Sequence, residues 1–245
     1  VRVKTAEVDT RARAIAVFLY LGLMLMLCKS AGVLVYAVVG CPLIFLTRWR
    51  MQVCVAAVLA TMVTLYPVMR GAHLVPVEQI VGCARGYSED RADSLKFRFD
   101  NEELLLAHAQ ERGLFGWGGY ERNLLHNPDT GETSSIADGG WIIALGNLGW
   151  AGFAAFFGLA SLPLWSLGWR GFADRSADVS RNTAGLALIL ALGLVDLLPN
   201  ATHVPFDWLI AGALLGVAEA LRRKQKDVAK TVTASPQPRR KRTVI

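Results

Sequence analysis

The chain has 245 residues, of which 53% are apolar and 19% are charged, and its formal net charge is +6. Soluble domains contain about 45–50% apolar and about 25% charged residues, so the composition argues against an ordinary soluble domain. The positive charge does not indicate a nucleic-acid-binding protein, because most basic residues flank apolar runs or lie in the C-terminal segment.

A transmembrane helix needs about 20 apolar residues, or fewer where the bilayer thins. Six runs approach this length: 14–28, 31–46, 51–69, 140–165, 183–198 and 208–221. Only Lys29 and Ser30 separate the first two runs. One helix over both would be about 50 Å long, which is too long for one crossing, so we expect a hairpin at 29–32. Small residues allow transmembrane helices to approach closely, and the fourth and sixth runs contain such residues: Gly146, Gly149, Gly152, Gly212 and Gly216.

Lysine and arginine residues mark the cytoplasmic side of a membrane protein. With six crossings, the basic clusters at 2–13, 48–50, 170–181 and 222–242 all fall on one side. A single helix over 14–46 would place the first two clusters on opposite sides, so the charges also favour a hairpin. We therefore expect both ends in the cytoplasm and 70–138 outside it.

The predicted fold is an all-α, polytopic transmembrane bundle of about six spans in a bacterial inner membrane. Residues 1–69 would form an N-terminal cytoplasmic segment and three transmembrane helices, and 70–138 a large, partly helical periplasmic loop. Residues 139–221 would form three more transmembrane helices. The basic tail, 222–245, contains two prolines near its end and is expected to be disordered beside anionic membrane lipids.

Within the loop, apolar residues at helical spacing predict an amphipathic helix over 94–112 that stops at Gly113. The loop also carries basic side chains that can hold a phosphate: Arg85, Arg91, Lys96, Arg98, Arg112 and Arg122. Glycines then alternate with aromatic residues over 113–120. Trp117 and Tyr120 offer flat faces on which sugar rings can stack, but aromatic residues are also common at membrane interfaces.

Ionisable groups near membrane depth are candidates for function. Asp196 and Asp207 lie near the outer ends of the last two runs. They are either functional groups at membrane depth or ordinary polar residues at the membrane–water interface. The four cysteines form no Cys-x-x-Cys pair and the four histidines have no zinc spacing. No metal or cofactor is predicted.

Four short patterns occur in the same order as in one known family. They begin with Lys29 and Ser30 at a helix start and continue with Arg98 between two phenylalanines. Gly113 to Gly118 and then Asp138 to Gly152 follow, the latter leading into the fourth apolar run. In this order the chain resembles the O-antigen ligase/polymerase superfamily of bacterial surface-polysaccharide membrane proteins, over about 14–216.

The resemblance implies metal-independent glycosyl transfer at the periplasmic face, with a glycan on undecaprenyl diphosphate as the donor. Lys29 and Arg98, with Arg122 as a further candidate, would hold the diphosphate, because cations stabilise a developing negative charge. Asp138 stands where ligases commonly have a histidine, so either Asp138 or His126 would act as the base. Trp117 and Tyr120 would contact the glycan. Other partners would be membrane lipids and further polysaccharide-assembly subunits, and no nucleic acid.

The missing histidine leaves a ligase, a polymerase-like relative and an inactive relative as alternatives. Members of the family have more spans than the six predicted here, so the chain is expected to correspond to the C-terminal half or to pair with another subunit. Two other classes of function remain open: a transporter or flippase for lipid-linked sugar, and a non-catalytic scaffold of a polysaccharide assembly complex.

Overall fold

The computed structural model describes residues 2–28, 30–173, 179–202 and 204–234. Within these ranges the secondary structure consists of helices, with no strand. The chain divides into two compact units, Val1–Thr47 and Arg48–Ile245, and each is described by itself. The all-α prediction is confirmed for the described residues.

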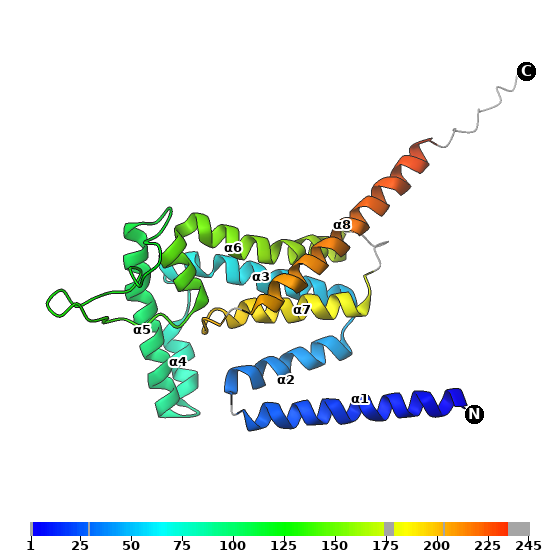
Figure 1. Ribbon diagram of the computed structural model, residues 1–245, viewed down its shortest axis with the longest axis horizontal. Helices are drawn as coiled ribbons and strands as arrows, with labels where there is room; N and C mark the ends of the chain where they lie inside the picture. The colour runs from blue at the N-terminus through cyan, green and yellow to red at the C-terminus, as the bar shows by residue number, and fades with distance from the viewer. Residues whose placement is uncertain (1, 29, 174–178, 203, 235–245) are drawn as a thin grey trace, which may run out of the picture. The chain divides into compact units, whose positions relative to one another are not determined.

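The first unit contains helix α1 (Arg2–Leu27) and helix α2 (Ala31–Leu46) (Figure 1). The helices pack through Phe18 and Phe45, whose ring centroids lie 6.3 Å apart in an edge-to-face arrangement. The chain therefore forms two helices here rather than one, as the charge pattern predicted. Lys29, which lies between them, is outside the described residues.

The second unit is built around three neighbouring helices (Figure 1): α3 (Trp49–Gly71), α6 (Gly140–Ala173) and α7 (Arg181–Asp196). Their contacts are made by buried apolar residues, among them Val53, Ala60, Phe157, Leu164 and Leu188. Helix α8 (Pro205–Ala234) packs against α6 and α7.

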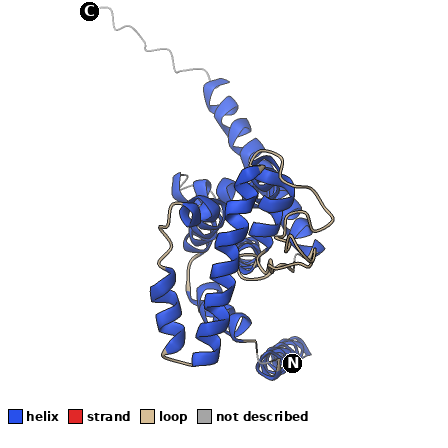
Figure 2. Ribbon diagram, turned by 90° about the vertical axis from the view of Figure 1, so that its left-hand side faces the viewer, coloured by secondary structure: helices blue, strands red, loops and turns tan. Residues whose placement is uncertain are grey.

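A pair of polar helices lies at one end of this bundle (Figure 1, Figure 2). They are α4 (Val77–Arg85) and α5 (Glu89–Glu111), which pack against each other, and α5 also contacts α6. Figure 2 shows α4 and α5 as an antiparallel pair seen from that end. The region 70–138 is thus partly helical, and its longer helix places polar side chains beside the start of α6.

Three described helices are long and apolar enough to cross a membrane: Thr10–Leu27, Trp49–Gly71 and Gly140–Phe172. Helix α2 is apolar but shorter, over Gly32–Leu46, and α7 has only 16 residues. The coarser prediction, a helical protein with membrane-spanning character, is supported. The count of six spans and the position of each end stay predictions.

Several predicted boundaries differ from the structure. Helix α5 starts at Glu89 rather than Ser94, because Glu89 and Asp90 favour a helix N-terminus. Helix α8 continues to Ala234, so residues 222–234 are helical where disorder was expected. This segment is rich in alanine, arginine, lysine and glutamine, all strong helix formers.

The glycines that bring helices together are not the expected ones. A Cβ at Gly212 or Gly216 would meet nothing within 4 Å. The close helix contact is instead made between α6 and α3, where a Cβ at Gly168 would lie 2.4 Å from the Cβ of Ala57. Predicting this contact requires knowing which helices are neighbours, and composition does not reveal that.

Candidate functional site

Helix α5 carries the polar residues that face the start of α6. Arg98, Glu102 and Leu105 are four and three residues apart, so they share one face of the helix. Leu105 and Glu102 are buried, and Arg98 is partly exposed. The apolar contacts of Leu105 and its neighbours therefore fix this face against the bundle and position Arg98 at its edge.

Arg98 and Asp138 come together although forty residues separate them in the chain. Nε of Arg98 lies 3.4 Å from Oδ2 of Asp138, and the two side chains keep exposed fractions of 40% and 35%. Nη1 of Arg98 donates a hydrogen bond of 3.0 Å to the carbonyl of Pro199. Its third nitrogen, Nη2, makes no hydrogen bond to any residue that the structure describes. The guanidinium is thus held at two points and still has a donor that a ligand can reach.

The start of α6 is tied to the turn that follows α7. The amide of Gly140 donates to the carbonyl of Asn200 at 2.9 Å, and the amide of Trp141 donates to that of Leu197 at 3.3 Å. A Cβ at Gly139 would lie 2.4 Å from the carbonyl oxygen of Leu198. Only glycine allows this approach, which fixes Asp138 beside Pro199 and Arg98.

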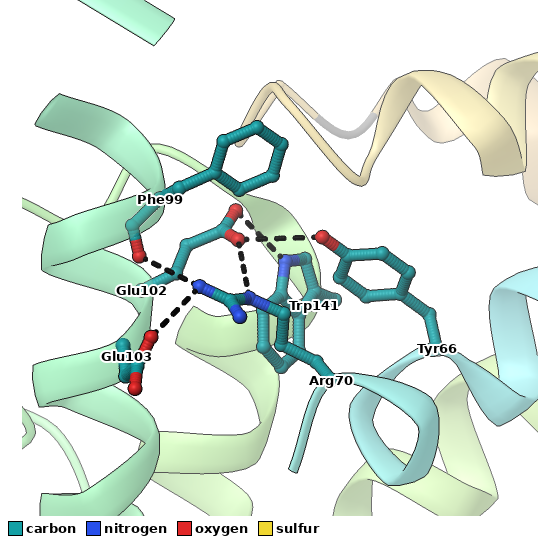
Figure 3. Close-up of polar contacts among 6 residues, drawn as sticks. All are labelled: Tyr66, Arg70, Phe99, Glu102, Glu103 and Trp141. Carbon is teal, nitrogen blue, oxygen red and sulfur yellow. Dashed lines mark hydrogen bonds and ion pairs between the residues drawn. The ribbon is translucent and has the colours of Figure 1, made fainter. Parts of the chain in front are cut away.

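A buried polar cluster lies one turn farther along α5 (Figure 3). Glu102 accepts hydrogen bonds from Nε1 of Trp141 at 3.2 Å and from the hydroxyl of Tyr66 at 3.4 Å. Nη2 of Arg70 donates to the carbonyl of Phe99 at 3.0 Å and to Glu103 at 3.3 Å. Arg98 with Asp138 and Glu102 with Trp141 therefore form two successive links between α5 and the start of α6.

Arg70 is almost fully buried, with an exposed side-chain fraction of 4%. Its Nε lies 4.0 Å from Oε2 of Glu102, close enough for an ion pair but too long for a hydrogen bond, and this Nε has no hydrogen-bond partner. Burial raises the pKa of the Glu102 carboxyl to about 7, although the Trp141 hydrogen bond and the charge of Arg70 oppose the rise. The negative charge of Asp138 adds to the rise in the pKa of Glu102.

The glycine-rich segment 113–118 holds a kink in α6. The kink lies at Gly149, whose φ of 65° and ψ of −170° suit glycine alone. The kink frees two carbonyls of α6 from helical hydrogen bonds. The carbonyl of Gly146 accepts from the amide of Trp117 at 2.8 Å, and the carbonyl of Asn147 accepts from the amide of Gly118 at 2.9 Å. In return, the carbonyls of 113 and 114 accept from the amides of 150 and 151, at 2.7 and 3.1 Å. The segment therefore satisfies the backbone on both sides of the kink.

The same segment places Trp117 against α5. Its Nε1 donates to the carbonyl of His108 at 2.9 Å, its ring stacks on the His108 ring at 4.3 Å, and the guanidinium of Arg112 lies 4.4 Å from its centroid. These contacts give Trp117 a packing role. Its predicted contact with sugar stays a prediction.

The remaining predicted site residues are spread over the loop. Tyr120 is 96% exposed, and its backbone has a positive φ of 64°. Nε of Arg122 donates to the carbonyl of Gly119 at 3.0 Å. His126 is exposed, its Nδ1 lies 3.1 Å from the carbonyl of Leu124, and it forms an isolated bridge with Thr133. The structure brings neither Arg122 nor His126 into contact with the Arg98–Asp138 pair.

Sequence reasoning missed the buried cluster of Tyr66, Arg70, Glu102 and Trp141. One signal was available: Arg70 is a charge at the end of an apolar run, and such a charge needs a partner. A second was the spacing of Glu102, one helical turn after Arg98. Neither signal identifies the partner, because that depends on how α3 and α5 cross.

Comparisons with protein-family models, with curated proteins and with solved structures gave no match to this chain. Its chemistry therefore rests on the contacts described above. Arg98 and Asp138 form the candidate site: an arginine with a free donor and a carboxylate, both partly exposed. The buried Glu102 cluster lies one turn farther along α5 and also links α5 to the start of α6.

Proposed function

We propose that the chain is a membrane glycosyltransferase-like protein that polymerises or ligates glycans carried on undecaprenyl diphosphate. The observation that carries this proposal is the contact between Arg98 and Asp138. The family resemblance gives these two residues complementary roles, diphosphate binding and proton abstraction, and those roles require them to act on the same substrate complex.

The chemistry of the pair suits such a reaction. Nη2 of Arg98 is available to a phosphate oxygen, and an arginine–phosphate hydrogen bond is charge-assisted and strong. As the diphosphate leaves the sugar, negative charge grows on its oxygens, and a fixed guanidinium stabilises that charge. Asp138 accepts the proton of the acceptor hydroxyl as the glycosidic bond forms.

The proposed topology follows the charge pattern. Six spans would place both ends in the cytoplasm and 70–138 at the periplasmic face of the inner membrane. Cys83 tests this arrangement, because it is exposed and is the one cysteine within 70–138. A membrane-impermeant maleimide should label Cys83 in spheroplasts with intact inner membranes. Labelling only after the membrane is permeabilised would contradict the topology.

The activity is tested with purified protein and a glycan on undecaprenyl diphosphate. The original chain should consume the lipid-linked glycan and release undecaprenyl diphosphate. Arg98→Ala and Asp138→Asn should each reduce the rate by about 10²-fold or more, the usual effect of losing a charge-stabilising group or a general base.

Asp90→Asn on the same helix and Lys224→Gln on α8 are controls, because both side chains are exposed and neither is a candidate site residue. These controls should keep the rate of the original chain. If the original protein does not consume the substrate, or if the controls lose as much activity as Arg98→Ala, the proposal is wrong.

A further inference from the structure

A cavity separate from the Arg98–Asp138 pair opens between the end of α3, segment 72–76, α4 and α5. Its volume is about 750 Å³, within the range of small-molecule sites. We call this cavity the α4–α5 groove. Residues three and four apart on α5 face it, namely Lys96, Asp100 and Glu103. Lys96 and Arg98 are two positions apart, so they point to nearly opposite sides of the helix.

The groove presents separate charges of both signs. Arg70 is held there by Glu103 at 3.3 Å. Arg85 also lines the groove, and its Nη2 forms an exposed ion pair at 3.6 Å with Asp93, which is not a lining residue. Three further charged groups line the groove and have no ion-pair partner in the described part of the chain: Lys96, Asp100 and Glu78. The groove therefore offers a free cation beside two free carboxylates.

Lys96 and Asp100 stand one helical turn apart, a spacing that places Cβ atoms about 5–6 Å from each other. Despite this proximity they form no ion pair within the described structure. A ligand with a negative group and a positive group joined by a short carbon chain can engage both at once. A ligand of a single charge would leave one of the two side chains facing a like charge.

The place of the groove indicates where such a ligand comes from. Helix α3 is apolar enough to cross a membrane over Trp49–Gly71, and the groove begins at Arg70, at its end. Valines and a proline line the groove beside the charges, namely Val75, Pro76, Val77 and Val81. Leu74 and Ile80 are exposed nearby, at 67% and 39%. Charges next to exposed apolar groups at the end of a membrane span suit a lipid head group and its acyl chains.

We propose that the α4–α5 groove binds a phospholipid whose head group carries both a phosphate and a primary ammonium. Lys96 and Arg85 hold the phosphate, and Asp100 and Glu78 accept hydrogen bonds from the ammonium. The proposal does not depend on glycosyl transfer. It requires only that α3 crosses a membrane.

The test is native mass spectrometry of the purified full chain in detergent, titrated with three lipids that have the same acyl chains. Phosphatidylethanolamine has both charges, phosphatidylcholine has an ammonium that cannot donate hydrogen bonds, and phosphatidylglycerol has only the phosphate. Phosphatidylethanolamine should bind about tenfold more tightly than either of the others, because it alone makes both sets of charge-assisted bonds.

Variants assign this preference to the groove. Lys96→Gln and Asp100→Asn should each weaken phosphatidylethanolamine binding by about tenfold, and Lys96→Arg should retain it. Lys224→Gln and Asp90→Asn, which change exposed side chains elsewhere, should leave binding unchanged.

Three results would overturn the proposal. The first is equal binding of the three lipids, and the second is full binding by Lys96→Gln and Asp100→Asn. The third concerns the source of the head group: free phosphoethanolamine displaces the lipid at equal concentration, so that the acyl chains contribute nothing.

Discussion

Glu102 makes the stability of the fold depend on pH. Burial raises the pKa of its carboxyl from 4.5 to about 7, although Trp141, Arg70 and Tyr66 favour the charged form and oppose the rise. The folded state therefore holds this proton more tightly than the unfolded state does. The stabilisation is fully present below pH 4.5 and is lost as the pH rises through about 7. A shift of this size corresponds to about 3 kcal/mol of unfolding free energy at most.

The measurement is unfolding by SDS in detergent micelles, followed by circular dichroism, at a series of pH values from 4 to 8. As the pH rises across this range, the unfolding free energy of the unsubstituted protein should fall by up to about 3 kcal/mol because Glu102 loses its proton. Glu102→Gln cannot titrate, so its unfolding free energy should change less over the same range. Glu103→Gln alters the neighbouring, 57% exposed side chain and should keep the original pH dependence. An identical pH dependence in Glu102→Gln and the original chain would refute the reasoning.

Three further predictions concern the packing around the kink and the bundle. Gly149→Ala should destabilise the fold by about 3 kcal/mol or more, because its Cβ would lie 2.5 Å from the amide nitrogen of Gly116 in a backbone conformation reserved for glycine. In Gly158→Ala, a control in the same helix, the new Cβ meets nothing within 4 Å, so stability should change by less than about 1 kcal/mol. A similar loss of stability in both variants would contradict the close packing of segment 113–118 against the kink. Trp117→Phe keeps an aromatic ring but loses the Nε1 hydrogen bond, so it should cost about 1 kcal/mol, and no loss would show that this bond is not formed in solution. Gly168→Ala should cost about 1–3 kcal/mol by forcing α3 and α6 apart, and unchanged unfolding would show that the helices do not meet there. All are read by the same SDS unfolding measurement.

The sequence predicted where the helices lie along the chain better than which helices pack against each other. The break between α1 and α2, the helix in 70–138 and the start of α6 follow from apolar periodicity, charge and glycine position, which are local properties. The extension of α8 to Ala234 was missed because its basic residues were read as a disordered tail, although they are strong helix formers.

For the candidate site, the sequence supplied Arg98 and Asp138 as separate candidates but not their contact. That contact depends on the turn after α7, where Pro199 holds Arg98 and Leu197 and Asn200 hold the start of α6. The aromatic pattern around Trp117 likewise does not reveal that a carbonyl of α5 accepts a hydrogen bond from its Nε1, and its contact with sugar stays a prediction. Both contacts join segments that are distant in the chain, so local sequence patterns do not identify them.

The most direct test of the central claim is the length of surface polysaccharide in cells that produce Arg98→Asp, Asp138→Arg or the double variant with both changes. The swapped pair can restore the ion pair but not the two separate roles, so all three variants should show short or absent chains at normal protein levels in the membrane. If the swapped pair restores the original chain length, the contact is purely structural. If the single variants keep normal chains, this pair is not the site of glycosyl transfer.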